Sequence, residues 1–275
     1  MNDHPTEPTQ TEIDAMLFRY RRPGILLNKT LRSDDPGLPG CWLGGRPTLP
    51  PEIEWPWDDV SGGTPMRFLG QINLAQIPPV AAYPEMPRTG TLFFFHEGLF
   101  EEYLNNSKWS HKVIYVESDV STHPTRRPPE MPDLSERPFF ELMKTKPDEE
   151  YKKTGEYKRW NFDLLLFEDF SRHEKLAHEL EWYLNDASIS VRNHLERLTE
   201  DRRDPTRDID PALHSLFGAS SRSRSPERDD DMVRLSGFEY DLDLGTSTNM
   251  TVYAVWISRK DLENRNFENT QLISG

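Results

Sequence analysis

Residues 66–74 read MRFLGQINL, and residues 91–95 read TLFFF. Each is a short apolar run bounded by turn-forming residues, which is typical of strands in a sheet. Residues 42–65, before the first run, are rich in Gly, Pro and Trp and predict an irregular segment that leads into the strand. Residues 112–117 (KVIYVE) have the same character as the two quoted runs. The first half of the chain therefore predicts several strands connected by turns.

The C-terminal half repeats these strand signals. They occur at residues 163–167 (DLLLF), 232–240 and, most strongly, 250–258 (MTVYAVWIS). Strands that follow one another through turns usually pair antiparallel, because parallel pairs need long crossover connections.

Helical spacing appears in three places. In residues 11–22, Ile13, Met16, Leu17 and Tyr20 fall at i, i+3, i+4 and i+7, and Pro23 ends the run. Two further helices are predicted, one after Ser171 with a capping box to Glu174 and one at about 188–199. The order of helix, strands, helices and strands favours an α+β fold with a mainly antiparallel sheet and flanking helices.

The charge balance excludes several classes of protein. The 275 residues include 33 Lys and Arg against 47 Asp and Glu, a formal net charge of −14. Binding to nucleic acid rests chiefly on neutralising phosphates, so this balance argues against a nucleic-acid partner. No apolar run approaches the roughly 18–20 residues that cross a bilayer, and MNDHPTEPTQ at the N-terminus has no signal-peptide character. Because the lone Cys41 can form no internal disulfide, we expect a protein of the cytoplasm.

The usual catalytic signatures are absent from the sequence. It contains no G-x-G-x-x-G, no G-x-x-x-x-G-K-[ST] and no G-x-S-x-G. We interpret Cys41, between Gly40 and Trp42, as a small core or loop residue rather than a nucleophile. We predict no catalytic residue and no cofactor.

Two stretches resemble metal motifs, but their spacing is wrong. His173 and His178 are five residues apart, so on a helix their rings point about 140° apart and cannot share an ion. Asp241 and Asp243 begin DLDLG like a calcium loop, but Gly stands at position 5 and Val252 at position 12. We predict no metal site and interpret the two acids as solvated turn residues, with a ligand or partner contact as the alternative.

Tryptophans and amides form one group of candidate binding residues. Trp55 and Trp57, with Trp42, either pack in the core or line a surface for a ligand or partner. Gln71 and Asn73 alternate with apolar neighbours and so share one side of their strand. Their amides either orient a polar ligand or make internal hydrogen bonds.

A second group contains histidines. His96 and Glu97 directly follow the TLFFF strand, and strand ends often carry ligand-binding groups. His214 lies in HSLFG, just before a polar segment predicted as a loop at 218–231. These three residues complete the candidate ligand- or partner-binding set.

Residues 44–95 also carry a series of spaced motifs. These are Gly-Gly-x-Pro-x-Leu-Pro at 44–50, Trp-Pro at 55–56, Phe-Leu-x-Gln-Ile-Asn-Leu at 68–74, a Pro pair at 78–79 and Gly-x-Leu-x-Phe-Phe at 90–95. In this order they resemble the YwqG-like family, a bacterial group of unknown function. HSLFG and the C-terminal VYAVWISRKDLENRNFEN are similar to later parts of that family, whereas TSTNM at 246–250 departs from its Trp-Gly-Asp-x-Gly turn.

The resemblance implies a single α+β domain and no particular reaction. It divides the chain into an N-terminal helix and lead-in, 1–39, and a YwqG-like domain, 40–275, with a divergent middle at about 118–211.

The negative net charge and the absence of catalytic motifs together favour a non-catalytic binding protein of the cytoplasm. An acidic surface steers a basic partner toward it, as an immunity protein does when it neutralises a basic toxin. The alternative is a small-ligand sensor or an enzyme with a pocket lined by Trp, Gln, Asn and His.

Overall fold

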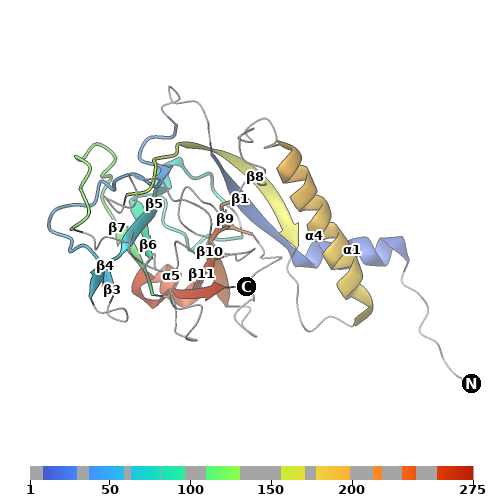
Figure 1. Cartoon of the computed structure of the whole chain (residues 1–275). Coiled ribbons are helices and arrows are strands. Elements are labelled where there is room, and N and C mark those ends of the chain that lie inside the picture. The colour runs from blue at the N-terminus through green and yellow to red at the C-terminus, as the bar shows by residue number, and fades with distance from the viewer. Residues whose placement is uncertain are drawn as a thin grey trace, which may run out of the picture.

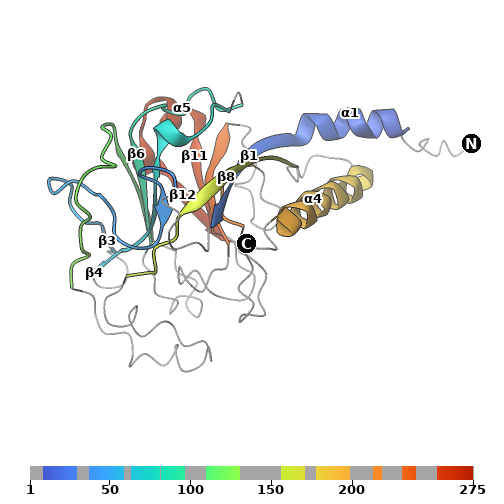
Figure 2. The ribbon, with the colours of Figure 1, turned by 90° about the horizontal axis from the view of Figure 1, so that it is seen from above.

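The computed structural model describes ten segments of the chain, and all structural statements refer to them. They are residues 9–29, 37–58, 63–80, 82–96, 110–130, 156–170, 178–198, 213–218, 231–239 and 253–274. Within them the dominant structure is antiparallel sheet, which confirms that part of the sequence prediction. Figures 1 and 2 show the two larger sheets side by side, with an arm extending from one of them.

The larger sheet has six strands, all paired antiparallel. In spatial order they are β12 (Gln271–Ser274), β11 (Tyr253–Ser258), β10 (Met232–Phe238), β9 (Ser215–Phe217), β1 (Arg21–Lys29) and β8 (Phe162–Phe170). Three of these strands correspond to the runs predicted at 163–167, 232–240 and 250–258. β8 is an edge strand, and all nine of its residues pair with β1.

The smaller sheet contains the two runs that open the sequence analysis. Its order is β2 (Trp42–Leu43), β5 (Arg67–Asn73), β6 (Thr91–His96) and β7 (His111–Val116). A short hairpin of β3 (Trp57–Asp58) and β4 (Thr64–Pro65) lies beside it.

Strand β6 explains why TLFFF is apolar throughout. Leu92 and Phe94 point into the main core, which lies between the two sheets. Phe93 and Phe95 point to the other side of the small sheet, where they pack with Trp55 and its neighbours. A strand buried on both faces has no polar alternation, so the run is continuous.

Strand β1 was not predicted from the sequence. Ile25 and Leu27 face the main core, while Leu26 faces the opposite side of the large sheet. Pairing with both β8 and β9 places β1 inside the sheet. Residues 21–29 of the predicted lead-in are therefore integral to the fold.

The predicted N-terminal helix is present as α1 (Gln10–Tyr20). Its capping box joins Thr9 and Glu12, two residues earlier than the Thr11 and Asp14 expected from the sequence. The chain then changes directly from helix to β1 at Arg21.

A single long helix, α4 (His178–Leu198), covers the region where two helices were predicted. The predicted start at Ser171 lies outside the described residues. Val191 and Leu195 of α4 pack on Leu26, Leu165 and Phe167. The paired strands β1 and β8, together with α1 and α4, form the arm that extends from the sandwich in Figures 1 and 2.

The C-terminal elements are short. α5 (Arg259–Glu263) and the 3₁₀ turn η5 (Phe267–Asn269) lie between β11 and β12, and the 3₁₀ turn η1 (Leu74–Gln76) follows β5. No helix among the described residues is long and apolar enough to cross a membrane.

Candidate functional site

At the Gly-Gly motif, two segments of the chain cross in direct contact. Gly44 and Gly45 both have positive φ, +63° and +64°, where residues other than glycine are strained. A Cβ on Gly44 would lie 2.1 Å from the carbonyl oxygen of Lys158. The Gly45 N–H donates to the Tyr157 carbonyl at 2.7 Å. The two glycines therefore let residues 42–45 pass directly against 157–160.

Trp55 and Trp57, close in sequence, have different environments. Trp55 is buried against Phe95, and its Nε1–H donates to the Met66 carbonyl at 2.8 Å. Trp57 is about half exposed on the β3–β4 hairpin. Of the two, Trp57 is the one available to a partner.

The amide of Gln71 is fully buried and joins two loops. Its Oε1 accepts the Thr48 N–H at 2.9 Å, while its Nε2 donates to the Gly40 carbonyl at 3.1 Å and the Thr48 hydroxyl at 3.0 Å. These bonds hold the loop before β2 and the loop after it against β5.

Asn73 has a similar internal role. Its Oδ1 accepts the Ala75 N–H and so caps η1, while its backbone N–H donates to the Cys41 sulfur at 3.2 Å. Burial raises the pKa of the Cys41 thiol to about 12, so it stays protonated at neutral pH. This agrees with the interpretation of Cys41 as a core residue.

Two histidines lie side by side on neighbouring strands of the small sheet. His96, the last residue of β6, lies directly opposite His111, the first of β7. His96 Nε2 is 3.1 Å from the Tyr157 hydroxyl, and His111 Nε2 is 3.0 Å from the Thr270 hydroxyl. His111 was not among the residues predicted from the sequence, although it directly precedes the strand run KVIYVE.

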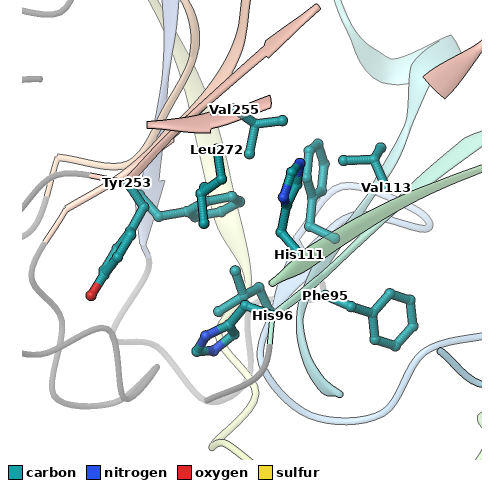
Figure 3. A pocket seen from close by; sticks show the side chains of 10 residues that line it. Phe95, His96, His111, Val113, Tyr253, Val255 and Leu272 are labelled. Carbon is teal, nitrogen blue, oxygen red and sulfur yellow. The ribbon is translucent and has the colours of Figure 1, made fainter. Parts of the chain in front are cut away.

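Both imidazoles border a small cavity between the sheets. In Figure 3 His96 and His111 lie on one side of it, and Tyr253, Val255 and Leu272 on the other. The cavity measures about 20 Å³, room for about one water molecule. Of the sequence candidates that lie among the described residues, only His96 lines it.

Burial keeps both rings neutral. It lowers the pKa of His96 to about 3, helped by the Arg67 charge, and the pKa of His111 to about 4. Neutral imidazole is the form that binds metals, but among the described residues no three His, Cys, Asp or Glu side chains gather to hold an ion.

His214 is buried beside the large sheet, with its ring 6.0 Å from that of Phe238. Its carbonyl accepts the Leu27 N–H at 2.7 Å, so this residue also helps to place β1. Glu97, Asp241 and Asp243 lie outside the described residues, and their predicted roles stay predictions.

Asp261 organises the last turn of the chain. It accepts hydrogen bonds from the Ser258 hydroxyl and from the side-chain amides of Asn266 and Asn269. The bonds from Ser258 and Asn269 lower the pKa of Asp261. Phe267, buried under this turn, fixes it to the core.

The Gly-Gly crossing, the buried Gln71 and the Asp261 turn span the sequence from β2 to β12. The family model described as a domain of unknown function, DUF1963, matches residues 42–274. The chain belongs to the DUF1963 family. No curated protein matches it at a significant level. The match begins after β1, although β1 is an interior strand of this DUF1963 sheet.

The arm of this DUF1963 protein carries most of the exposed large apolar side chains that the structure describes. They are Phe18, Leu166, Trp182, Tyr183, Ile189 and Leu198. Trp182 is 72% exposed and Phe18 70% exposed, more than Trp57 on the sandwich. The exposure of Trp182 was not expected from the sequence, because the predicted apolar stripe of the helix runs through Tyr183 and Leu184 and omits Trp182.

An ion-pair network fixes the arm to the sandwich. Arg192 on α4 bonds Glu239, which follows β10, at 2.8 and 3.3 Å, and also Glu196 at 2.6 Å. Burial opposes the charge of Arg192, but the bonds with Glu239 and Glu196 outweigh it and raise the pKa of Arg192. Glu239 also accepts the Leu213 N–H at 3.2 Å. These contacts hold α4 in one orientation on the large sheet.

Proposed function

We propose that this DUF1963 chain is a non-catalytic binding protein of the cytoplasm whose partner is a basic protein. The observation that carries the proposal is the exposure of apolar side chains on the arm, with Trp182 and Phe18 as the most exposed. Exposed apolar side chains that gather on one surface are typical of interaction sites. Trp is also among the residues that contribute most to binding energy at interfaces.

The charge of the chain supports a basic partner. The described residues contain 22 Asp and Glu against 18 Lys and Arg, a net charge of −4, whereas the whole chain carries −14. The sandwich and arm are thus close to neutral, and most of the excess negative charge belongs to the remaining segments. A field of this sign accelerates encounter with a cationic protein and repels anionic ones.

The internal use of the predicted polar residues supports a role without catalysis. The side-chain amides of Gln71 and Asn73 form hydrogen bonds to backbone groups of neighbouring loops and turns. The Cys41 thiol, with its raised pKa, is a poor nucleophile.

The sharpest form of the proposal is toxin immunity. The motifs at 44–95 resemble the YwqG-like group, which supports a bacterial origin for this chain. A bacterial cytoplasm is where an acidic protein would neutralise a basic toxin before it acts.

The test begins in the native host. The tagged full chain is recovered at low ionic strength, bound proteins are identified, and each is purified and titrated with the chain by calorimetry. We expect a basic protein that binds with an affinity falling steeply as salt rises. If that protein is a toxin, its expression alone stops growth and co-expression with the chain restores it. Recovery of acidic or neutral partners only, or of none, would refute the proposal.

A second candidate function rests on the cavity beside His96 and His111. Its apolar lining and two neutral imidazoles suit a small uncharged ligand, which would have to widen a space of about 20 Å³. Native mass spectrometry of the chain purified from its host tests this idea. A bound mass that disappears when Leu69→Trp fills the cavity would favour it, and a bare chain would oppose it.

A further inference from the structure

We propose that the outward face of α4 is the surface that receives the basic partner. In this arrangement Trp182 and Ile189 contact an apolar side chain of the partner, and Asp186 binds its Lys or Arg. The inference rests on the proposed function and adds to it the location and chemistry of the contact.

The helix geometry places these three residues on one stripe. At about 100° per residue, Trp182, Asp186 and Ile189 fall within roughly 60° of one another. Trp182 points roughly 180° away from Val191, which packs against the large sheet. The stripe therefore faces away from the sandwich, and all three side chains are exposed.

The stripe has the composition of an interface centre. An exposed Trp and an exposed Ile, about 10.5 Å apart along the helix axis, can hold one or two apolar side chains between them. An indole also attracts the guanidinium of an Arg at its face. Such a pair gives a cationic partner both apolar contact and charge recognition.

Asp186 provides a negative charge on this stripe for a Lys or Arg of the partner. Among the residues that the structure describes, no Lys or Arg forms an ion pair with it. Arg192, on the same helix, is already bound to Glu196 and Glu239. Asp186 thus remains available to a cation from outside.

A second copy of this chain is a poor occupant of the stripe. To place Trp182 against Ile189 of another α4, two antiparallel helices would have their twofold axis near residues 185 and 186. The two Asp186 carboxylates would then lie close together beside the axis, and like charges brought together across an interface are unfavourable. A basic chain meets the same stripe without this repulsion.

The ion pairs of Arg192 prepare the surface for binding. Because they fix α4 on the sheet through Glu239, little ordering of the helix remains to be done when a partner arrives. Binding to a surface that is already ordered loses less entropy, so contacts of modest area suffice.

The test compares variants of the full chain in calorimetric titrations with the purified basic partner. We expect Trp182→Ala and Asp186→Lys each to weaken binding at least tenfold, and Asp186→Asn to reduce its dependence on salt. Glu263→Lys is the matched control for Asp186→Lys, since it makes the same change of charge at an exposed acid of α5 on the sandwich, and it should change the affinity less than twofold. Circular dichroism and thermal unfolding confirm that each variant is folded.

The outcomes separate this inference from the proposed function. If the wild-type chain binds a basic partner and the α4 variants bind it equally well, the function stands and the location on α4 is wrong. If no basic partner binds the wild type, both fail. A wild-type chain that dimerises in sedimentation, and becomes monomeric with Trp182→Ala, would assign the stripe to self-association and overturn the inference.

Discussion

Arg192 on α4 and Glu239 after β10 form a two-point ion pair, with nitrogen–oxygen distances of 2.8 and 3.3 Å. Both side chains are largely buried. This pair connects residues 47 positions apart and joins the arm to the large sheet.

Loss of this pair should destabilise the fold. Glu239→Gln leaves Arg192 with only Glu196. A buried charge that loses its sole partner costs about 3–5 kcal/mol, so the loss of one of two partners should cost somewhat less. We expect urea denaturation to show a loss of roughly 2–4 kcal/mol in the free energy of unfolding. Glu168→Gln removes the exposed pair with Arg21 on the same arm and should cost about 1 kcal/mol or less. Equal losses in the two variants would contradict this account of the arm.

Gln71→Leu tests the internal role of the buried amide. The change leaves the Thr48 N–H and the Gly40 carbonyl without their partner, and each buried group left unbonded costs about 1–3 kcal/mol. We expect a loss of roughly 2–5 kcal/mol in chemical denaturation. Gln76→Leu, on η1 close by, should change stability by only about 0.5 kcal/mol. A stable Gln71→Leu protein with altered ligand binding would instead favour the ligand role considered from the sequence.

The sequence predicted the parts of the fold whose pattern is local. TLFFF and YAVWIS are nearly continuous apolar runs, and each forms a strand buried on both faces or nearly so. Strand β1 was missed because RRPGILLNK contains Pro23 and Gly24, which usually mark turns. Glycine suits this position, since a Cβ would lie 2.6 Å from the ring of Phe167 and the ring would have to move. Phe167 lies 143 positions away in sequence, so no local pattern could indicate this contact.

The contacts of the candidate site residues were also not predictable from local sequence patterns. Strand alternation pointed to Gln71 and the end of the TLFFF strand pointed to His96, but the partners of these two side chains are brought to them by the loops of the folded chain. These partners are Thr48 and Gly40 for Gln71, and Tyr157 for His96. The exposure of Trp182 depends on which side of α4 meets the sheet, and that is decided by Leu26 and Phe167 on distant strands. The spacing of residues in the sequence shows which side chains share one face of the helix. Only the packing of the helix on the sheet shows which face points to solvent.

The two buried histidines should make stability depend on pH. Their folded-state pKa values, about 3 and 4, lie below the ordinary 6.5, so between these values the unfolded chain binds more protons than the folded one. Their contribution is present above pH 6.5 and is lost progressively as the pH falls toward 4. We expect His111→Gln to reduce the slope of unfolding free energy against pH in this range. His194→Gln changes an exposed histidine on α4 and should leave this slope unchanged. If the His111→Gln protein showed the same slope as the wild type, the prediction would be wrong.

Two glycines with nearly the same backbone test the crossing of the chain. Gly44 and Gly63 have φ of +63° and +77°, so replacing either by Ala costs about 1 kcal/mol in backbone strain. At Gly63 nothing lies within 4 Å of the added methyl group, whereas at Gly44 it would lie 2.1 Å from the Lys158 oxygen. We therefore expect Gly63→Ala to lower the free energy of unfolding by about 1 kcal/mol and Gly44→Ala to lower it by at least about 3 kcal/mol or to prevent folding. Thermal and urea unfolding of both variants measure the difference. If the two losses were equal, residues 42–45 would not pass against 157–160 as closely as the structure has them, because only the second methyl group has a backbone atom in its way.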